Sequence, residues 1–284
     1  MASASRYNIC MSSTSSTSAN MRRLCQPARI RALCGAAAQS VAIEVVPQTG
    51  STNADLLARA ASLTGPLLLL AHDQTAGRGR AGRSWLSSPE GSLTFSLAWQ
   101  FHCPLQELIG LPLTIGVALA DAFAQLNVRV ALKWPNDILQ DGKKLAGILI
   151  ETATVKAPAA TWAVIGVGIN LQLPTDLAQQ IAQPAANLGS QTQDRETIMA
   201  VLLETLVMNL QQFEAHGFAA FQARWNALHA HTGQAVALLE QGRIVQEGLA
   251  VGVDNIGRML LDTASAGRIH IMAGDVSLRS LVAA

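Results

Sequence analysis

The sequence predicts an α+β protein in which a mixed sheet with flanking helices is followed by a small β-barrel. Strand-like and helix-like segments alternate from Val41 onward, as expected of a sheet that helices cover. After His231, short apolar runs separated by glycines show no helical period, which is typical of a small all-β domain. Half of the 284 residues are apolar, so the chain can bury a sizeable core. We therefore expect one domain over residues 41–231 and a second over residues 232–284.

The first forty residues differ in composition from the rest. Ser, Ala and Arg dominate, no acidic residue precedes Glu44, and Ser12–Ser18 is of low complexity. Such a composition is typical of disorder, so we interpret residues 1–40 as a disordered or extra N-terminal segment. Organellar targeting is the minor alternative, and translation from Met21 is another.

The first half of the larger domain alternates between strands and helices. Ser51–Asp55 resembles a helix start in which Thr52 caps the free amides. Ser92–Trp99 has the period of two that a half-buried strand shows. Apolar residues on one helical face indicate a helix over Leu108–Leu126. Further strands are expected at Val41–Val46, Leu67–Ala71 and Val128–Leu132.

The second half of this domain opens with a β-hairpin, because Asp141-Gly142 supplies a tight turn between two strand-like runs. Asp194 can cap a long helix that Gly217 ends. The hairpin strands, the strand that follows and a last helix are expected at Ile138–Gln140, Lys144–Ile150, Trp162–Leu173 and Phe218–Leu228.

Charge and cysteine content weigh against several classes of protein. With 20 basic and 19 acidic residues the net charge is +1, which gives no reason to expect nucleic acid or an anionic membrane as partner. The uncharged stretch Ala157–Thr175 contains prolines and amides, so we expect no transmembrane helix. The four cysteines lack Cys-x-x-Cys spacing and predict neither zinc nor disulfides. A cytoplasmic protein fits best.

The segment Gly77–Trp85 is built to hold an anion, because arginines supply forked donors and glycines allow close backbone approach. Gly77, Gly79 and Gly82 match the dinucleotide-binding spacing, and with Arg83-Ser84 they nearly match a P-loop. Both patterns need a helix directly after the loop, but here a strand follows. The arginines themselves must therefore neutralise the anion, unless this is a solvated basic loop.

Three further motifs follow in order: Lys133-Trp134-Pro135-Asn136-Asp137, Lys144-Leu145-Ala146-Gly147-Ile148-Leu149-x-Glu151 and Gly166-x-Gly168-Ile169-Asn170. Together with the glycine–arginine segment they resemble the biotin–protein ligases. The resemblance spans Ser51 to the C-terminus, and Gly274–Arg279 resembles the terminal β-domain of that family. Ala81 departs from it, since many relatives carry arginine there.

This resemblance implies a fold and an activity. The fold would be a catalytic domain like those of class II aminoacyl-tRNA synthetases, followed by an SH3-like β-barrel, in a monofunctional type without a DNA-binding domain. The enzyme would use ATP to activate biotin as biotinyl-5′-AMP, releasing pyrophosphate. It would then transfer biotin to a lysine of a biotin carboxyl carrier protein, such as that of acetyl-CoA carboxylase, releasing AMP. No membrane or direct DNA binding is expected, and a homodimer is an option.

The resemblance also implies roles for individual residues, each named here at its position in this chain. Lys144 and Arg80 would be catalytic, and Arg80 would also retain the reactive adenylate. Biotin would be bound by Ser51, Thr52, Asn53, Gln74, Gly77, Arg78, Arg80, Lys144 and Gly147. ATP and the adenylate would be bound by Arg78, Arg80, Arg83, Trp85, Asn136, Asp137 and Asn170, with Asp137 as a Mg²⁺ ligand.

Simpler structural roles remain open for several of these residues. Asn170 could cap a strand end, Trp85 could fill the core, and Lys144 could be a solvated turn lysine. His229 and His231 lie outside every motif, and we interpret them as a polar surface pair. Lipoate or octanoate transfer, a DNA-binding regulator and an inactive binding module are the competing functions.

Overall fold

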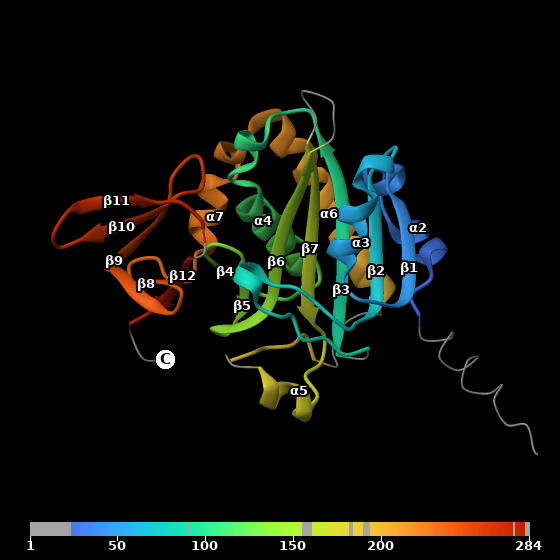
Figure 1. Ribbon diagram of the computed structural model, residues 1–284, viewed down its shortest axis with the longest axis horizontal. Coiled ribbons are helices and arrows are strands. Elements are labelled where there is room, and N and C mark those ends of the chain that lie inside the picture. Colours follow the sequence, from blue (N-terminus) through green and yellow to red (C-terminus); the bar gives the residue numbers. More distant parts are fainter. Residues whose placement is uncertain are drawn as a thin grey trace, which may run out of the picture.

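A seven-stranded sheet between layers of helices forms the larger part of the molecule, and a second sheet lies beside it (Figure 1). The computed structural model describes residues 24–89, 91–154, 161–181, 184–189, 194–274 and 276–281. In the large sheet the strand order is β1-β2-β3-β7-β6-β5-β4, with β1 and β2 parallel and the other pairs antiparallel. This confirms the predicted mixed sheet. The strands are β1 Ala42–Thr49, β2 Leu67–Gln74, β3 Ser92–Phe101, β4 Ala131–Lys133, β5 Asp137–Gln140, β6 Lys143–Thr154 and β7 Thr161–Asn170.

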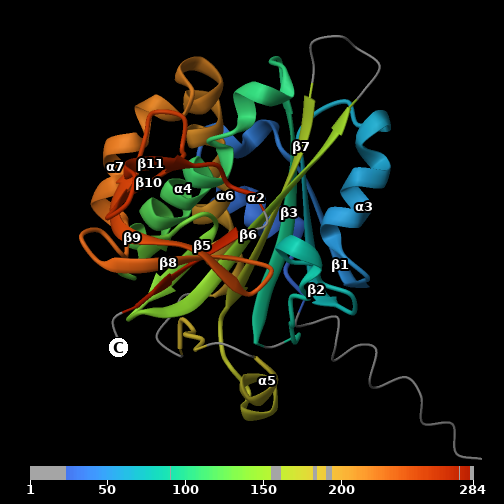
Figure 2. The ribbon, with the colours of Figure 1, turned by 60° about the vertical axis from the view of Figure 1, so that its left-hand side comes forward.

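Helices cover both faces of this sheet (Figure 2). Leu68 and Leu70 of β2 pack in the main core, whereas Leu67 and Leu69 pack in a smaller cluster with Leu56 of α3. The interior strand β3 is likewise buried along nearly all its length, so the prediction of a half-buried strand there was wrong. The helices are α2 Pro27–Leu33, α3 Thr52–Arg59, α4 Leu111–Gln125, α5 Thr175–Gln180, α6 Arg195–His216 and α7 Gln222–Leu228.

The helix ends follow local chemistry. Asp194 accepts a hydrogen bond from the Thr197 amide and caps α6, and Gly217 at φ 63° ends it, as predicted. For α3 the cap is Ser51, whose side chain accepts from the Ala54 amide. The expectation that Thr52 caps this helix was therefore wrong, and the Thr52 hydroxyl takes part in other contacts. Short 3-10 turns lie at Ala37–Ser40, Ala60–Ser62, Arg80–Gly82, Leu105–Leu108 and Phe218–Ala220.

The predicted hairpin joins β5 and β6. Asp141 and Gly142 both have positive φ, 49° and 74°, which is the geometry that a tight hairpin turn requires. A register shift at Ile138/Leu139 interrupts the pairing of the two strands.

Residues 24–40 are ordered, contrary to the expectation of a disordered segment over residues 1–40. Ile30 of α2 is fully buried, and the Glu204 carboxylate on α6 accepts hydrogen bonds from the amides of Ala37 and Ala38, both at 2.9 Å. Packing against α6 therefore orders this stretch. Residues 1–23 lie outside the described part of the chain.

The C-terminal region is a five-stranded antiparallel sheet with the order β11-β10-β9-β8-β12. This confirms the predicted small β domain and agrees with an SH3-like fold. It is attached to the larger domain by hydrogen bonds, among them one from Trp134 Nε1 to the Gly257 carbonyl at 3.3 Å. The strands are β8 Ala235–Glu240, β9 Arg243–Val253, β10 Met259–Thr263, β11 Gly267–Ile271 and β12 Val276–Ser280.

His229 and His231 lie where the two domains meet, and their exposed fractions are 7% and 9%. The interpretation as a polar surface pair was therefore wrong. The Ala230 amide donates to the Leu132 carbonyl at 2.8 Å, which fixes the segment between the two histidines beside β4. Burial lowers the pKa of His229 to about 3 and also lowers the pKa of His231.

One described stretch, Leu105–Gln125, is long and apolar enough to cross a membrane, but 72% of it is buried inside the protein. It comprises α4, which packs between the sheet and α6. Cys25, Cys34 and Cys103 are free thiols.

Candidate functional site

A cavity of about 540 Å³ opens between the two domains and collects most of the predicted site residues. The larger domain supplies nearly all of its lining, and β12 adds Ser277 and Arg279. The predicted residues that line it are Ser51, Thr52, Asn53, Gln74, Arg78, Arg80, Arg83, Trp85, Asn136, Asp137, Lys144, Gly147 and Asn170. Gly77 lies just behind this lining, where a Cβ would be 2.4 Å from the Trp85 carbonyl oxygen.

The segment Gly77–Trp85, called here the glycine–arginine loop, folds back on itself as a small hairpin. The Trp85 amide donates to the Gly77 carbonyl at 2.9 Å, and the Gly79 amide donates to the Arg83 carbonyl at 2.7 Å. Ala81 and Gly82 form its tip with φ of 54° and 68°. Two successive residues with positive φ make this tip a tight turn. A positive φ costs an alanine more than a glycine. No helix of α type starts here, in agreement with the sequence prediction.

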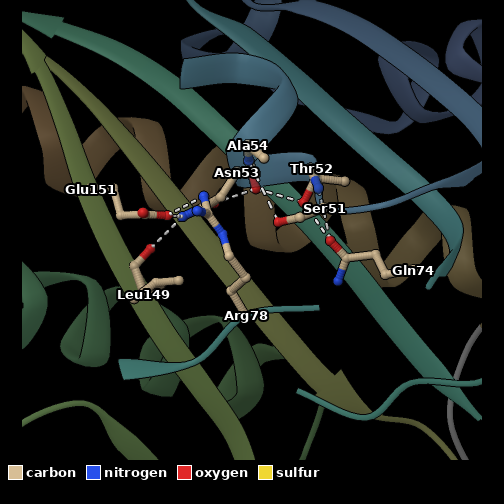
Figure 3. A network of polar contacts seen from close by, with 9 residues as sticks. Ser51, Thr52, Asn53, Ala54, Gln74, Arg78, Leu149 and Glu151 are labelled. Atoms are coloured by element: carbon tan, nitrogen blue, oxygen red, sulfur yellow. Dashed lines mark hydrogen bonds and ion pairs between the residues drawn. The ribbon is translucent and has the colours of Figure 1, made fainter. Parts of the chain in front are cut away.

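Four residues with hydroxyl or amide groups, Ser51, Thr52, Asn53 and Gln74, line one end of the cavity (Figure 3). Together with the fully buried Ser96, which bonds to two of them, they are called here the polar floor. The Ser96 hydroxyl donates to Asn53 Oδ1 at 2.5 Å and lies 2.7 Å from the Thr52 hydroxyl. The Thr52 amide donates to Gln74 Oε1 at 2.8 Å. This hydrogen bond to its oxygen fixes the orientation of the Gln74 side-chain amide, and its NH₂ group points away from Thr52 in Figure 3. Such a floor suits a neutral ligand with polar anchor points.

Arg78 reaches from the glycine–arginine loop to Glu151 on β6. Its Nη2 lies 2.9 Å from Glu151 Oε2, and the same oxygen accepts a hydrogen bond from Asn53 Nδ2 at 2.9 Å. The guanidinium charge of Arg78 is thus balanced by a carboxylate, whereas the sequence suggested that it would face a ligand carboxylate. Glu151 closes the third motif, but its type alone gave no reason to assign it a site role.

Arg80 points toward the other end of the cavity. Its Nη1 donates to Asn136 Oδ1 at 3.0 Å, and its Nη2 donates to the carbonyl of Gly274. Asn136 is itself fixed, because its Nδ2 donates to the Ile148 carbonyl at 2.7 Å. These two contacts hold the Arg80 guanidinium in place at this end of the cavity.

Lys144 lies in the cavity rather than in solvent at the hairpin turn. Its Nζ is 2.6 Å from Asp137 Oδ1, and both side chains are largely buried. The ammonium also lies 5.7 Å from the centroid of the Trp85 ring, a cation–π distance. By contrast with Lys144, the neighbouring Lys143 is exposed.

The indole ring of Trp85 packs against the backbone of the sheet. A Cβ at Gly168 would lie 2.3 Å from the indole, and one at Gly147 would lie 3.3 Å from it. These two glycines therefore make room for the ring, and Gly168 was not singled out from the sequence. The ring is part of the cavity wall, where both stacking on a base and simple filling remain compatible with its position.

Asn170 uses its amide in the fold. Its Nδ2 donates to the carbonyls of Lys144 and Ala186 at 3.3 and 3.0 Å. This ties the end of β7 to the start of β6, which is the strand-capping role left open from the sequence. The role of reading adenine with this NH₂ group gains no support from these contacts.

Four cations, called here the cationic wall, lie near one another in the cavity: Lys133 and the three cations that act on it electrostatically, Arg83, Lys144 and Arg279. Burial lowers the pKa of Lys133; Asp137 opposes this shift, and the three other cations add to it. The wall therefore carries a local excess of positive charge in a chain whose net charge is +1. Lys133 and Arg279 were missed as site residues, although both lie inside quoted motifs.

The residues near Asp137 do not form a magnesium site by themselves. Its carboxylate already pairs with Lys144, and the described parts of the chain contain no group of three or more His, Cys, Asp or Glu side chains that could hold a metal ion. Mg²⁺ usually takes one or two carboxylates together with substrate phosphates. A protein-only metal centre does not fit this geometry.

Comparison with known proteins agrees with this cavity. Residues 43–170 match the biotin/lipoate A/B protein ligase family, and residues 231–279 match the biotin protein ligase C-terminal domain. A Mycobacterium tuberculosis protein named biotin–[acetyl-CoA-carboxylase] ligase is 36% identical over 253 residues, which are 86% of this chain and 91% of that protein. The chain belongs to the biotin protein ligase family. It is therefore a ligase, and the predicted recognition and fold class are confirmed.

Two other members of the biotin protein ligase family extend the comparison. The bifunctional ligase/repressor BirA of Escherichia coli is 34% identical over 246 residues, covering 84% of this chain and 74% of BirA. The structure of the biotin protein ligase from Aquifex aeolicus in complex with biotin and ATP has a TM-score of 0.70 at 29% identity, covering 84% of this chain and 99% of that one. The match of residues 231–279 weighs against the lipoate alternative, because the description of that domain names biotin protein ligases alone.

Proposed function

We propose that this chain activates biotin with ATP as biotinyl-5′-AMP and transfers it to a lysine of a biotin carboxyl carrier protein, such as that of acetyl-CoA carboxylase. The observation that carries the proposal is that one cavity has a polar floor at one end and a cationic wall at the other. Biotin has a neutral urea group and a carboxylate, and ATP carries several phosphate charges. The two ends of the cavity match these two chemistries.

In the first step the biotin carboxylate attacks the α-phosphate and pyrophosphate leaves. Negative charge then gathers near one phosphate, and fixed cations that follow this charge lower the barrier. Arg80, held by Asn136 and the Gly274 carbonyl, is placed to bind the carboxylate and the phosphate. Lys144 would turn from Asp137 toward the reacting oxygens, and Arg83 would face the outer phosphates.

In the second step the amine of a carrier lysine attacks the activated carbonyl, and AMP leaves. The carrier amine forms the new bond to the biotin carbonyl as the bond to AMP breaks. No covalent enzyme intermediate is involved, so the chain needs no nucleophile of its own. Retention of the adenylate by Arg80 would direct biotin to the carrier rather than to other lysines.

Magnesium would enter with the phosphates of ATP, whose oxygens it prefers, and would neutralise part of their charge. Asp137 is the nearest candidate ligand from this chain, on condition that Lys144 first moves away from it.

Two further properties belong to this proposal. The biotin–[acetyl-CoA-carboxylase] ligases among the relatives are bacterial proteins, which supports action in the cytoplasm. Direct DNA binding is not expected, and a homodimer stays an option; gel shift and sedimentation test them.

The proposal is tested by incubating purified protein with ATP, Mg²⁺, biotin and a biotin carrier domain, followed by detection with streptavidin. We expect a labelled carrier that depends on ATP and on the acceptor lysine. A carrier that stays unlabelled, with biotin-dependent exchange of pyrophosphate into ATP also absent, would contradict it.

A further inference from the structure

The glycine–arginine loop is attached to the rest of the molecule by a few side chains. Most of its residues between Arg78 and Ser84 are at least partly exposed, and its backbone hydrogen bonds are mainly internal. Arg80 attaches one side to Asn136 and the C-terminal domain. Arg78 attaches the other side to Glu151, across the polar floor (Figure 3).

Glu151 joins two elements that meet at the polar floor. Its Oε2 accepts from Arg78 Nη2 on the loop and from Asn53 Nδ2 on α3, each at 2.9 Å. Gly166 on the adjacent strand leaves the space for Asn53, since a Cβ there would lie 2.3 Å from Asn53 Oδ1. Packed neighbours thus orient the Glu151 carboxylate from the side of Asn53. On its other side the carboxylate holds the long side chain of Arg78.

The charge of Arg78 is balanced within the protein, because its guanidinium pairs with the Glu151 carboxylate. A paired guanidinium attracts a further anion less strongly, so Arg78 is better suited to closing the loop than to binding a ligand anion. The Arg78 and Glu151 side chains are 42% and 29% exposed, and an ion pair at this exposure can break and re-form easily.

We propose that Glu151 is a positioning residue that latches the glycine–arginine loop through Arg78 and so keeps biotinyl-adenylate in the cavity. This inference rests on the proposed function for the identity of the ligand. It extends that function to Glu151, which neither sequence motif nor family resemblance assigned to a role. The latch acts on ligand release through the loop, whereas Arg80, which also retains the adenylate, and Lys144 act on the chemistry.

The test measures dissociation of a synthetic, non-hydrolysable sulfamoyl analogue of biotinyl-adenylate, so that it does not depend on catalysis. In Glu151→Gln we expect release to be about tenfold faster, because the charge-assisted bond is lost while the side-chain shape is kept. Arg78→Gln should show the same increase, and the double variant should show no further increase. Glu44→Gln is the matched control, since Glu44 pairs with Arg59 at 2.7 Å with both side chains about as exposed, away from the cavity.

Release from Glu151→Gln at the wild-type rate, or effects of the two single variants that multiply in the double variant, would overturn the latch. Salt provides a measurement independent of the Glu151 substitution. Raising ionic strength from about 50 to about 500 mM should speed release from both proteins, because cations also hold the anionic analogue, but it should speed release more from the wild type than from Arg78→Gln. An equal response of both proteins would also overturn the latch. Failure of the wild type to make adenylate from ATP and biotin would instead contradict the proposed function alone.

Discussion

The polar floor and the cationic wall are two ends of one cavity, and they handle charge in opposite ways. On the floor, hydroxyls and amides bond to one another, and the one cation that crosses it, Arg78, is paired with Glu151. At the wall, four cations lie near one another, and the carboxylate of Asp137 pairs with one of them, Lys144. A neutral ring and a polyphosphate can thus be bound in one space without competing for the same groups.

The largest expected effect comes from the wall. Lys144→Ala should lower the rate of adenylate formation roughly 100- to 1,000-fold, because a positioned cation near the reacting phosphate is lost. The measurement is single-turnover formation of biotinyl-adenylate. Lys143→Ala is the matched control, since this neighbour is exposed and should behave as wild type. Equal losses in both variants would remove Lys144 from the reaction.

A smaller effect would sharpen the division between the two ends. Arg279→Ala should raise the KM for ATP about tenfold and leave the KM for biotin nearly unchanged. Arg279 belongs to the cationic wall, and the substitution removes one charged hydrogen-bond donor for the phosphates of ATP. Steady-state kinetics with each substrate varied in turn measures this. Arg268→Ala on the same domain, where Arg268 pairs with Asp262 in solvent, is the control. An equal rise in both KM values would show that the two ends are not separate.

The last prediction concerns stability rather than catalysis, at His229, where the two domains meet. His229 is buried and neutral, with its pKa lowered from 6.5 to about 3, so the unfolded chain binds a proton that the folded chain does not. The free energy of unfolding should therefore fall as the pH drops below about 6.5, by up to about 2 kcal/mol at about pH 5. Urea unfolding at several pH values measures it. In His229→Gln this fall should shrink, whereas His102→Gln, at an exposed histidine, should keep it.

The sequence predicted features that depend on neighbours along the chain. The turn at Asp141-Gly142, the cap at Asp194 and the stop at Gly217 each follow from local backbone chemistry, and the structure confirms them. The four motifs also placed most of the lining residues of the cavity. In these cases short-range signals and tertiary structure agree.

What the sequence missed depends on contacts between distant segments. Glu151 gains its role from Arg78, which lies 73 positions away in the chain. Arg279 reaches the cavity because the C-terminal sheet lies against the larger domain. The burial of His229 and the order of residues 24–40 have the same origin, because tertiary packing outweighs composition there. The motifs contained Glu151 and Arg279 but did not show which residues these side chains would meet.

The central claim is that this cavity joins biotin to a carrier lysine, and the mass of the carrier tests it most directly. The purified chain is incubated with ATP, Mg²⁺ and a biotin carrier domain, together with biotin, lipoic acid or octanoic acid in separate reactions. We predict one biotin adduct per carrier, on a single lysine, and no adduct with the other two acids. A lipoyl or octanoyl adduct in the absence of a biotinyl adduct, or no adduct in any reaction, would contradict the claim.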